Sequence, residues 1–305
     1  ESAVADCLED AVAGALSWQA VVALAGGRPV ARAAALLPGE AGASPGEGGV
    51  GLFECLEGFP EAGVAVLGHC ARWLRSKGAV SAVAPRLDAL RSGLLVSGFE
   101  RPHTIFTAHN PPYYLGLFTA AGFTVRTRML GYSYSRRFIP SLPEVPAEGF
   151  RVRHPDLGRP GEELDRLEAF QAEVFGGSLG FLPRDRQGGR RLLGRLLPLM
   201  DPELAVLAED ESGAAIGFLL CLPDAWQRRR PVDRARWVTA GVAPAWRRRG
   251  VGLAMGVVLL ERLLGKGYQT LDGSWVLEGN ERARLLAGLL GGEPDGEYAL
   301  LGKEL

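Results

Sequence analysis

The chain has 305 residues, a formal net charge of −1, 47% apolar residues and 23% charged residues, which is typical of a globular protein. The length exceeds that of one hydrophobic core, so we expect two domains, and the near-neutral charge predicts no nucleic-acid partner and no membrane partner. Neither the four cysteines nor the four histidines show metal-ligand or C-x-x-C spacing, and no apolar run reaches the ~20 residues of a membrane span. We therefore expect a cytoplasmic protein with reduced thiols and no metal.

The N-terminal half predicts a hairpin, a helix, a strand and a second helix, in that order. The turn Gly26-Gly27-Arg28-Pro29 separates the two hairpin strands, and Gly78 ends the first helix. Asn110 precedes the second helix, which ends near Gly122-Phe123. The expected elements are strands at 18–25 and 30–37, a helix at 61–77 and a strand at 79–84.

A linker is expected at residues 137–149. Pro140, Pro143 and Pro146 are spaced so that neither a helix nor a central strand can form there. We place the domain boundary at this segment, which gives an N-terminal domain at 1–140 and a C-terminal domain at 150–305.

The C-terminal half repeats the order of the N-terminal half. Its helices show apolar residues at helical spacing, and its strands are short apolar runs bounded by turn residues. The expected elements are strands at 150–153, 204–208, 214–222, 234–242, 268–276 and 297–301, and helices at 162–175, 185–199, 251–264 and 281–290. The shared order predicts an internal duplication. The fold class expected is α/β (an α+β mixed sheet): two units, each a twisted mixed sheet with helices on both sides.

The segment from residue 242 to 252 carries the strongest chemical signal. A strand is expected to end at Val242, Pro244 stops further sheet pairing, and two glycines open the next helix. A helix N-terminus offers unpaired N–H groups and a positive dipole end, which suit a pyrophosphate. Gly250 and Gly252 let phosphate oxygens approach the backbone, and the three arginines at 247–249 add positive charge.

This segment resembles motif A of the GNAT superfamily of N-acetyltransferases, V-x-P-x-x-R/Q-x-x-G-x-G/A. The matching positions are Val242, Pro244, Arg247, Gly250 and Gly252, and further on Asn280 and Ala283 match the family's N-x-x-A. The resemblance covers about residues 150–305. In the first half, Asn110 and Gly122-Phe123 resemble the family's closing N…G-F, but no R-x-x-G-x-G precedes the helix at 61–77. That half therefore resembles a degenerate repeat without the CoA-binding motif.

The resemblance implies that acetyl-CoA, or another acyl-CoA, binds the C-terminal domain as co-substrate. The strand ending at Val242 would splay from the strand at 268–276, and the pantetheine arm would lie between them. The Val242 N–H could then face the thioester carbonyl as an oxyanion donor. The expected cofactor-binding residues are Gly241, Val242, Arg247, Arg248, Arg249, Gly250, Val251, Gly252 and Asn280.

An acceptor amine would attack the thioester directly. Keeping an alkyl amine neutral at pH 7 costs about 4.6 kcal/mol, so a base is useful, and we favour Glu278 over Asp272. The family often has a tyrosine seven residues after the asparagine as the acid toward the leaving thiolate, but this chain has Ala287 there. Ser274 or Tyr298 then supplies the proton, or none is needed.

The expected function is transfer of an acetyl group from acetyl-CoA to a primary amine of a small-molecule or peptide acceptor. The alternative is a non-catalytic CoA-binding sensor or scaffold, with a possible homodimer. A more distant alternative is dinucleotide binding, because Gly250, Gly252 and Gly256 spell G-x-G-x-x-x-G and Asp272 follows about 20 residues later. Against it, the turn after Val242 is long, and too little chain follows for further βα units. The arginine run at 228–230 is interpreted as a solvated loop.

Overall fold

The computed structural model describes residues 15–38, 46–86, 92–136, 142, 144–145, 148–156, 158–175, 196–227 and 231–305. Contacts divide the chain into two compact units. Unit 1 contains the described residues up to Met129 together with Gly296–Leu305, and unit 2 contains those between Leu130 and Asp295. The expected helix at 185–199 and the arginine run at 228–230 lie largely or wholly outside the described residues.

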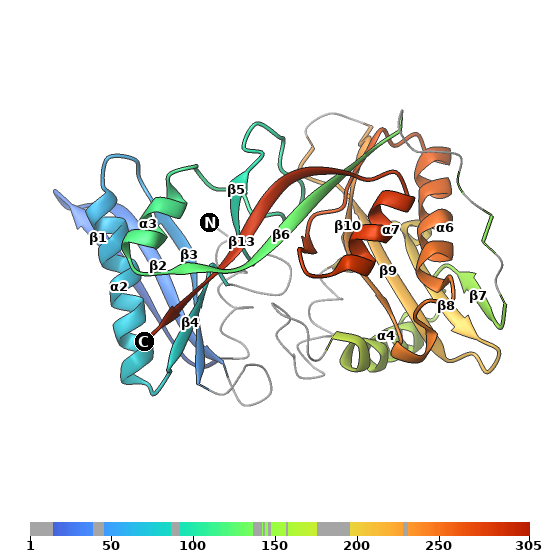
Figure 1. Cartoon of the computed structure of the whole chain (residues 1–305), viewed down its shortest axis with the longest axis horizontal. Coiled ribbons are helices and arrows are strands. Elements are labelled where there is room, and N and C mark those ends of the chain that lie inside the picture. Colours follow the sequence, from blue (N-terminus) through green and yellow to red (C-terminus); the bar gives the residue numbers. More distant parts are fainter. Residues whose placement is uncertain are drawn as a thin grey trace. The chain divides into compact units, whose positions relative to one another are not determined.

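Unit 1 is a mixed sheet with two helices packed on a shared core (Figure 1). Strands β1 to β3 are antiparallel neighbours, β3 runs parallel to β4, and both β4 and β5 pair antiparallel with β13. The core gathers Leu67 and Leu74 of the first helix and Phe118 of the second. The elements are β1 (Ala15–Ala25), β2 (Arg28–Pro38), β3 (Glu47–Cys55), α2 (Pro60–Ser76), β4 (Ser81–Ala84), β5 (Leu94–Ser97), α3 (Tyr114–Ala120), β6 (Thr124–Ser135) and β13 (Glu293–Glu304).

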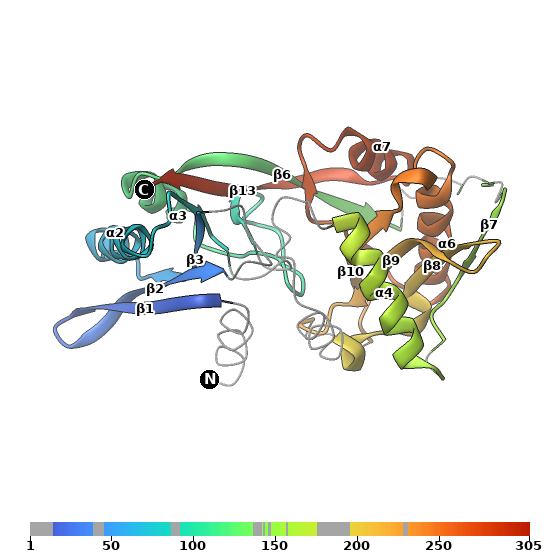
Figure 2. The same ribbon diagram turned by 90° about the horizontal axis from the view of Figure 1, so that it is seen from below.

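Unit 2 repeats this plan. Strands β7 to β10 are antiparallel neighbours, β10 runs parallel to β11, and β11 is antiparallel to the end of β6. Helix α6 packs on one face of this sheet, and α4 lies on the opposite face (Figure 2). The elements are β7 (Phe150–Arg153), α4 (Pro160–Phe175), β8 (Ala205–Asp210), β9 (Ala215–Pro223), β10 (Arg234–Val242), α6 (Val251–Gly265), β11 (Thr270–Asp272), β12 (Val276–Leu277) and α7 (Glu281–Leu289), with short 3-10 turns at Leu197–Leu199, Pro202–Leu204 and Pro244–Trp246.

Two strands, β6 and β13, are exchanged between the halves of the chain. Each pairs with the sheet that is formed mainly by the other half. β6 follows the helices of the N-terminal half, yet its residues 133–135 pair with β11 in unit 2. β13 follows α7, yet its residues 301–304 pair with β4 in unit 1. The compact units therefore differ from the expected linear division into 1–140 and 150–305, because strand pairing assigns residues 130–136 to unit 2 and 296–305 to unit 1.

The mixed α/β fold class is confirmed, and the strand at 234–242 and the helix starting at Val251 lie where the sequence predicts them. One expected strand is interrupted: residues 268–276 form only β11 and the start of β12, because the chain leaves β10 after Asp272. Three strands went unpredicted, β3, β5 and β6. Gly48, Gly49 and Gly51 hide the strand pattern of β3.

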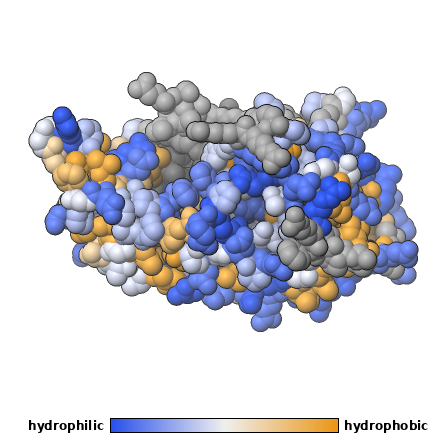
Figure 3. All heavy atoms as spheres, turned by 90° about the horizontal axis from the view of Figure 1, so that it is seen from above, coloured by the Kyte–Doolittle hydropathy of each residue, from blue (hydrophilic) through white to orange (hydrophobic). Residues whose placement is uncertain are grey.

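Hydrophilic residues intermix with small hydrophobic areas on the face shown in Figure 3. Exposed large apolar side chains include Trp18, Val22 and Leu24 on β1 and Leu285 and Leu289 on α7. Within the described ranges, no helix is long and apolar enough to cross a membrane.

Candidate functional site

The central strands of unit 2 diverge. β10 pairs with β11 only through Arg234–Arg236 and Thr270–Asp272, and beyond Arg236 it continues to Val242 paired with β9 alone. A bulge lies in β10 between Trp237 and Thr239. β11 ends at Asp272, and the chain then reaches β12, which pairs with β6. An opening between the two parallel strands therefore begins after their third paired residue.

The backbone of Val242 faces this opening. The N–H of the next residue, Ala243, donates to Ile216 O on the β9 side at 2.8 Å. Because successive peptide groups of a strand point to opposite sides, the N–H and C=O of Val242 point away from β9. The carbonyl accepts a hydrogen bond from Arg247 Nε at 3.1 Å. The Val242 N–H, the expected oxyanion donor, thus lies on the side of β10 where β11 no longer pairs with it.

The turn between β10 and α6 presents the N-terminus of α6. Gly250 is the N-cap in the left-handed conformation (φ 80°), and no side chain caps the helix, so the first-turn N–H groups remain open to a ligand. Arg247, Arg248 and Arg249 are exposed beside it, and the Arg249 guanidinium lies 4.2 Å from the ring centroid of Trp246. This arrangement suits an anion.

Gly252 and Gly256 of α6 differ in how closely neighbouring side chains approach them. A methyl group at Gly252 would lie 3.5 Å from Leu286 and 3.7 Å from Val242, so protein packing alone does not demand glycine there. A methyl group at Gly256 would lie 2.5 Å from Cδ1 of Leu290, so a larger residue there would displace the side chain of the residue that ends α7. The third glycine of the dinucleotide-like pattern therefore serves helix packing. The antiparallel strands β7 to β10 also differ from a doubly wound parallel sheet.

Buried polar groups line the end of β11. Arg236 and Asp272 are register partners on β10 and β11, and both are buried. Arg236 Nη2 donates to Ser274 O at 3.2 Å, and Ser274 N–H donates to Asp272 Oδ1 at 2.6 Å. Among the described residues, the buried Ser274 Oγ and Trp275 Nε1 have no hydrogen-bond partner. Such groups cost stability unless a ligand or water bonds them.

Other expected site residues lie around α7 or in unit 1. Glu278 is exposed in the turn before α7, and its carbonyl accepts from Arg284 Nη1 at 3.2 Å. Asn280 is the N-cap of α7 and accepts from the Ala283 N–H at 3.1 Å. Tyr298, considered above as a proton donor, lies in unit 1.

One residue that the sequence did not single out also lies in this part of unit 2. Tyr134 of β6 is buried, pairs in register with Leu271, and has its ring centroid 6.2 Å from that of Trp237. Burial raises its pKa well above the usual range. The alternation Tyr132, Ser133, Tyr134, Ser135 is a strand signal that would have located it.

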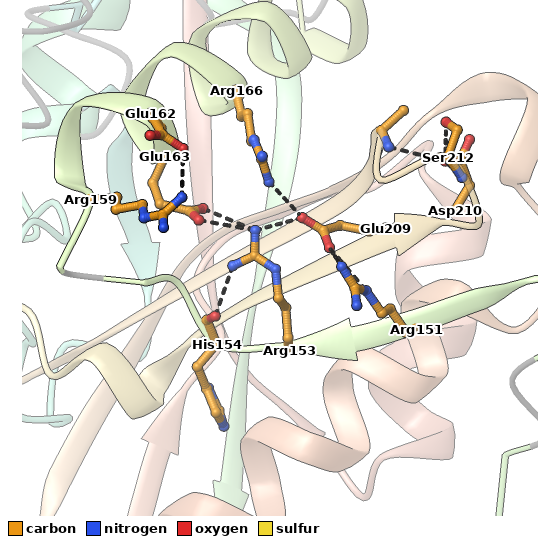
Figure 4. Close-up of polar contacts among 11 residues, drawn as sticks. Arg151, Arg153, His154, Arg159, Glu162, Glu163, Arg166, Glu209, Asp210 and Ser212 are labelled. Carbon is orange, nitrogen blue, oxygen red and sulfur yellow. Dashed lines mark hydrogen bonds and ion pairs between the residues drawn. The ribbon is translucent and has the colours of Figure 1, made fainter.

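An ion network fixes α4 against the sheet of unit 2 (Figure 4). The carboxylate of Glu209 on β8 is only 1% exposed and contacts three arginines, Arg151 at 2.9 Å, Arg153 at 2.5 Å and Arg166 of α4 at 2.9 Å. Arg153 also contacts Glu163 of α4 at 3.0 Å. The hydrogen bond from Arg153 is the main cause that lowers the pKa of Glu209. The network joins β7, β8 and α4.

Unit 2 thus combines a mixed sheet whose central strands diverge with an uncapped helix N-terminus. Residues 180–291 match the model of the acetyltransferase (GNAT) family. This part of the chain is therefore similar to a family of acyltransferases that generally use acyl-CoA as co-substrate. Among the described residues, no group of His, Cys, Asp and Glu could hold a metal ion.

Solved structures share the fold of the whole chain. A GCN5-related N-acetyltransferase from Sphaerobacter thermophilus is 19% identical with a TM-score of 0.62, over 94% of this chain and 80% of that one. A tandem GNAT protein from the clavulanic acid biosynthesis pathway is 14% identical with a TM-score of 0.63, over 94% and 83%. The two-unit plan is thus a tandem GNAT fold.

Two curated proteins are similar in sequence. Bacterial ceramide synthase of Caulobacter vibrioides is 25% identical over 268 residues, which cover 76% of this chain and 69% of that protein. Protein YghO of Escherichia coli K12 is 24% identical over an alignment of 323 positions, which covers 94% of this chain and 82% of that protein.

Proposed function

We propose that unit 2 transfers an acetyl group from acetyl-CoA to a primary amine. The observation that carries this proposal is the Val242 N–H, which faces the opening between β10 and β11 just ahead of the uncapped α6 N-terminus. The helix N-terminus and its arginines would hold the pyrophosphate, and the opening would take the pantetheine arm. The cofactor-binding residues proposed are Gly241, Val242, Arg247, Arg248, Arg249, Gly250, Val251, Gly252 and Asn280.

In the proposed reaction the amine nitrogen attacks the thioester carbon. The C–N bond forms, the C–S bond breaks, and the Val242 N–H stabilises the oxyanion. Glu278 is the proposed base, acting through water because it is exposed in the turn before α7. Ser274 is a proposed hydroxyl donor at the site, since its buried Oγ has no partner among the described residues.

The same site can be tested for the length of the acyl group and the class of amine that it accepts. A relative is named bacterial ceramide synthase, so longer acyl-CoAs and lipid amines belong in the test beside acetyl-CoA and small or peptide amines. The experiment measures CoA-SH release from acyl-CoAs of increasing chain length with each class of amine. The proposal predicts the highest kcat/KM with acetyl-CoA, and a preference for long acyl chains would contradict it.

A second candidate, a CoA sensor without catalysis, is favoured by one observation. Position 287, where the family often has its tyrosine, holds a buried alanine. The sensor predicts saturable acetyl-CoA binding without amine-dependent CoA-SH release. The same assay separates the two, because only the transferase releases thiol in proportion to acylated amine.

A further inference from the structure

Tyr134 comes from the strand that follows the N-terminal repeat, yet it belongs to the core of unit 2. It lies opposite Leu271 on β11, is 3% exposed, and packs in the same core as Ala287 and Leu290 at α7. The exchange of β6 into the sheet of unit 2 therefore places a phenol beside the helix that lacks the family's tyrosine.

The ring of Tyr134 lies in a slot formed by two glycines. A methyl group added to Gly273 would lie 2.8 Å from its Cε2, and one added to Gly292 would lie 2.7 Å from its Cζ. The ring thus passes over the end of β11 where the chain has no side chain. Its neighbour on the far side is Trp237, the first residue of β10 beyond the paired segment. Tyr134 reaches the point at which the two strands diverge.

The phenol end of Tyr134 also lies close to position 287. A methyl group on Gly292, in contact with Cζ of Tyr134, would be 3.0 Å from the carbonyl oxygen of Ala287. No hydrogen bond joins the Tyr134 hydroxyl to another of the described residues. Buried tyrosine hydroxyls usually have a partner, so this one is available to a ligand.

We propose that Tyr134 donates the proton that the departing CoA sulfur takes up, which rests on the acyl transfer proposed above. As the C–S bond breaks, its electron pair stays on sulfur, and the proton moves from the Tyr134 oxygen to that sulfur. The tyrosinate then regains the proton that the amine has released through its base. Burial, and then the nearby Tyr132 and Asp272, raise the pKa of Tyr134, so the donor is protonated at neutral pH.

The choice of Tyr134 over Ser274 follows from the faces of β11. Side chains alternate along a strand, so Leu271, which packs with Tyr134 toward α6 and α7, lies on the face opposite to Asp272. Ser274 donates its N–H to the Asp272 side chain, which lies on that opposite face. The family's tyrosine would extend from α7, which is on the Tyr134 face.

The test measures the bound thiol directly and does not need the acceptor. CoA and desulfo-CoA are titrated into wild type, Tyr134→Phe and Tyr132→Phe, and the thiolate of bound CoA is followed by ultraviolet absorbance against pH. Tyr132 is the matched comparison, a buried tyrosine on the same strand and face. A hydrogen bond to a thiolate should favour CoA over desulfo-CoA about tenfold and lower the thiol pKa by about one pH unit.

We expect Tyr134→Phe to lose both effects and Tyr132→Phe to keep them. Unchanged values in Tyr134→Phe, with CoA still bound, would overturn the role of Tyr134 alone, and so would a loss in Tyr132→Phe instead. Wild type that binds no CoA would overturn the proposed function itself. If Tyr134→Phe does not fold, fluorotyrosine at position 134 keeps the ring and lowers the phenol pKa. The pKa of the bound thiol should then fall further, and no change would overturn the proposal.

Discussion

Cys55 in unit 1 and Val242 in unit 2 occupy the same place in the repeated fold, yet their backbones meet different partners. Each ends a bulged strand whose parallel neighbour has already diverged. In both units the N–H of the next residue bonds the antiparallel neighbour strand at 2.8 Å. The N–H groups of Cys55 and Val242 therefore both face the opening between the parallel strands.

In unit 1 this position is filled by the protein's own side chains. The Cys55 N–H donates to the Tyr114 hydroxyl at 3.0 Å, and the Tyr113 hydroxyl donates to Cys55 O at 2.8 Å. In unit 2 the Val242 carbonyl takes a hydrogen bond from the exposed Arg247. A tyrosine pair thus occupies in unit 1 the place where the cofactor is proposed to bind in unit 2.

The turns that follow β3 and β10 also differ in whether they could bind phosphate. In unit 1 only four residues separate Cys55 from α2, and Glu57, Phe59 and Pro60 stand where phosphate would bind. An acidic group beside a helix start repels phosphate, and proline lacks the N–H that would bind it. A short turn and two tyrosines thus distinguish the packed core of unit 1 from the proposed cofactor site of unit 2.

The largest effect should come from filling the α6 N-terminus. Gly252→Trp would project a large side chain into the phosphate position, and acetyl-CoA affinity should fall more than 100-fold by calorimetry, since a bulky group excludes the ligand outright. Gly252→Ala is the matched control, because its methyl group fits beside Leu286. If wild type and Gly252→Trp bound acetyl-CoA equally, the N-terminus of α6 would not be the phosphate site. Unit 2 would then resemble unit 1 in lacking such a site.

Each unit also buries a glutamate among arginines, Glu209 in unit 2 and Glu47 in unit 1. Glu209→Gln should lower the free energy of unfolding by about 2 kcal/mol, less than for a fully buried pair because water reaches the arginines. The control Glu162→Gln removes only an exposed pair with Arg159 and should change little.

The effect of Glu209→Gln on the free energy of unfolding should depend on pH. The pKa of Glu209 is lowered in the folded state, so its stabilisation is present above the unfolded pKa and is lost as pH falls through the folded one. Urea unfolding of wild type and Glu209→Gln should therefore converge below about pH 4. A constant difference down to pH 2 would contradict the assigned charge.

The arginines before α6 should affect acetyl-CoA affinity through the phosphates of the cofactor. Arg247→Ala should weaken acetyl-CoA about tenfold and leave acetyl-pantetheine unchanged, because one charge-assisted hydrogen bond is lost. The exposed Arg72 of α2 in unit 1 provides the control Arg72→Ala. An equal loss for both thioesters would mean that Arg247 acts on the turn itself, whose Val242 carbonyl it bonds.

The smallest effect is expected in unit 1. Tyr114→Phe leaves the buried Cys55 N–H without its partner, so the free energy of unfolding should fall by about 1 kcal/mol in urea titration. The number of acetyl-CoA molecules bound per chain should not change, because the turn after Cys55 still lacks a phosphate site. A second molecule bound by this variant would show that Tyr114 alone closes unit 1.

The local signals for unit 2 were readable in the sequence. Pro244, the arginines and Gly250 marked the strand end, the turn and the helix start, and the structure places β10 and α6 there. The interruption after Asp272 was not readable, because residues 268–276 form one continuous strand-like run. The divergence depends on β12 pairing with β6, which is distant in sequence.

Long-range pairing also explains why Tyr134 was missed. Residues 124–135 stand before the proline-rich linker, so a division by sequence order gave them to the first domain. Only the pairing of Leu271 with Tyr134 brings the tyrosine into unit 2. The roles of Glu278 and Ser274 stay predictions.

The most direct measurement is a calorimetric titration of wild type with acetyl-CoA, repeated with NADP as competing ligand. One acetyl-CoA per chain, displaced by CoA and not by NADP, is the predicted result, with an open site in unit 2 and a closed one in unit 1. No binding of acetyl-CoA, two molecules per chain, or displacement by NADP would contradict this account.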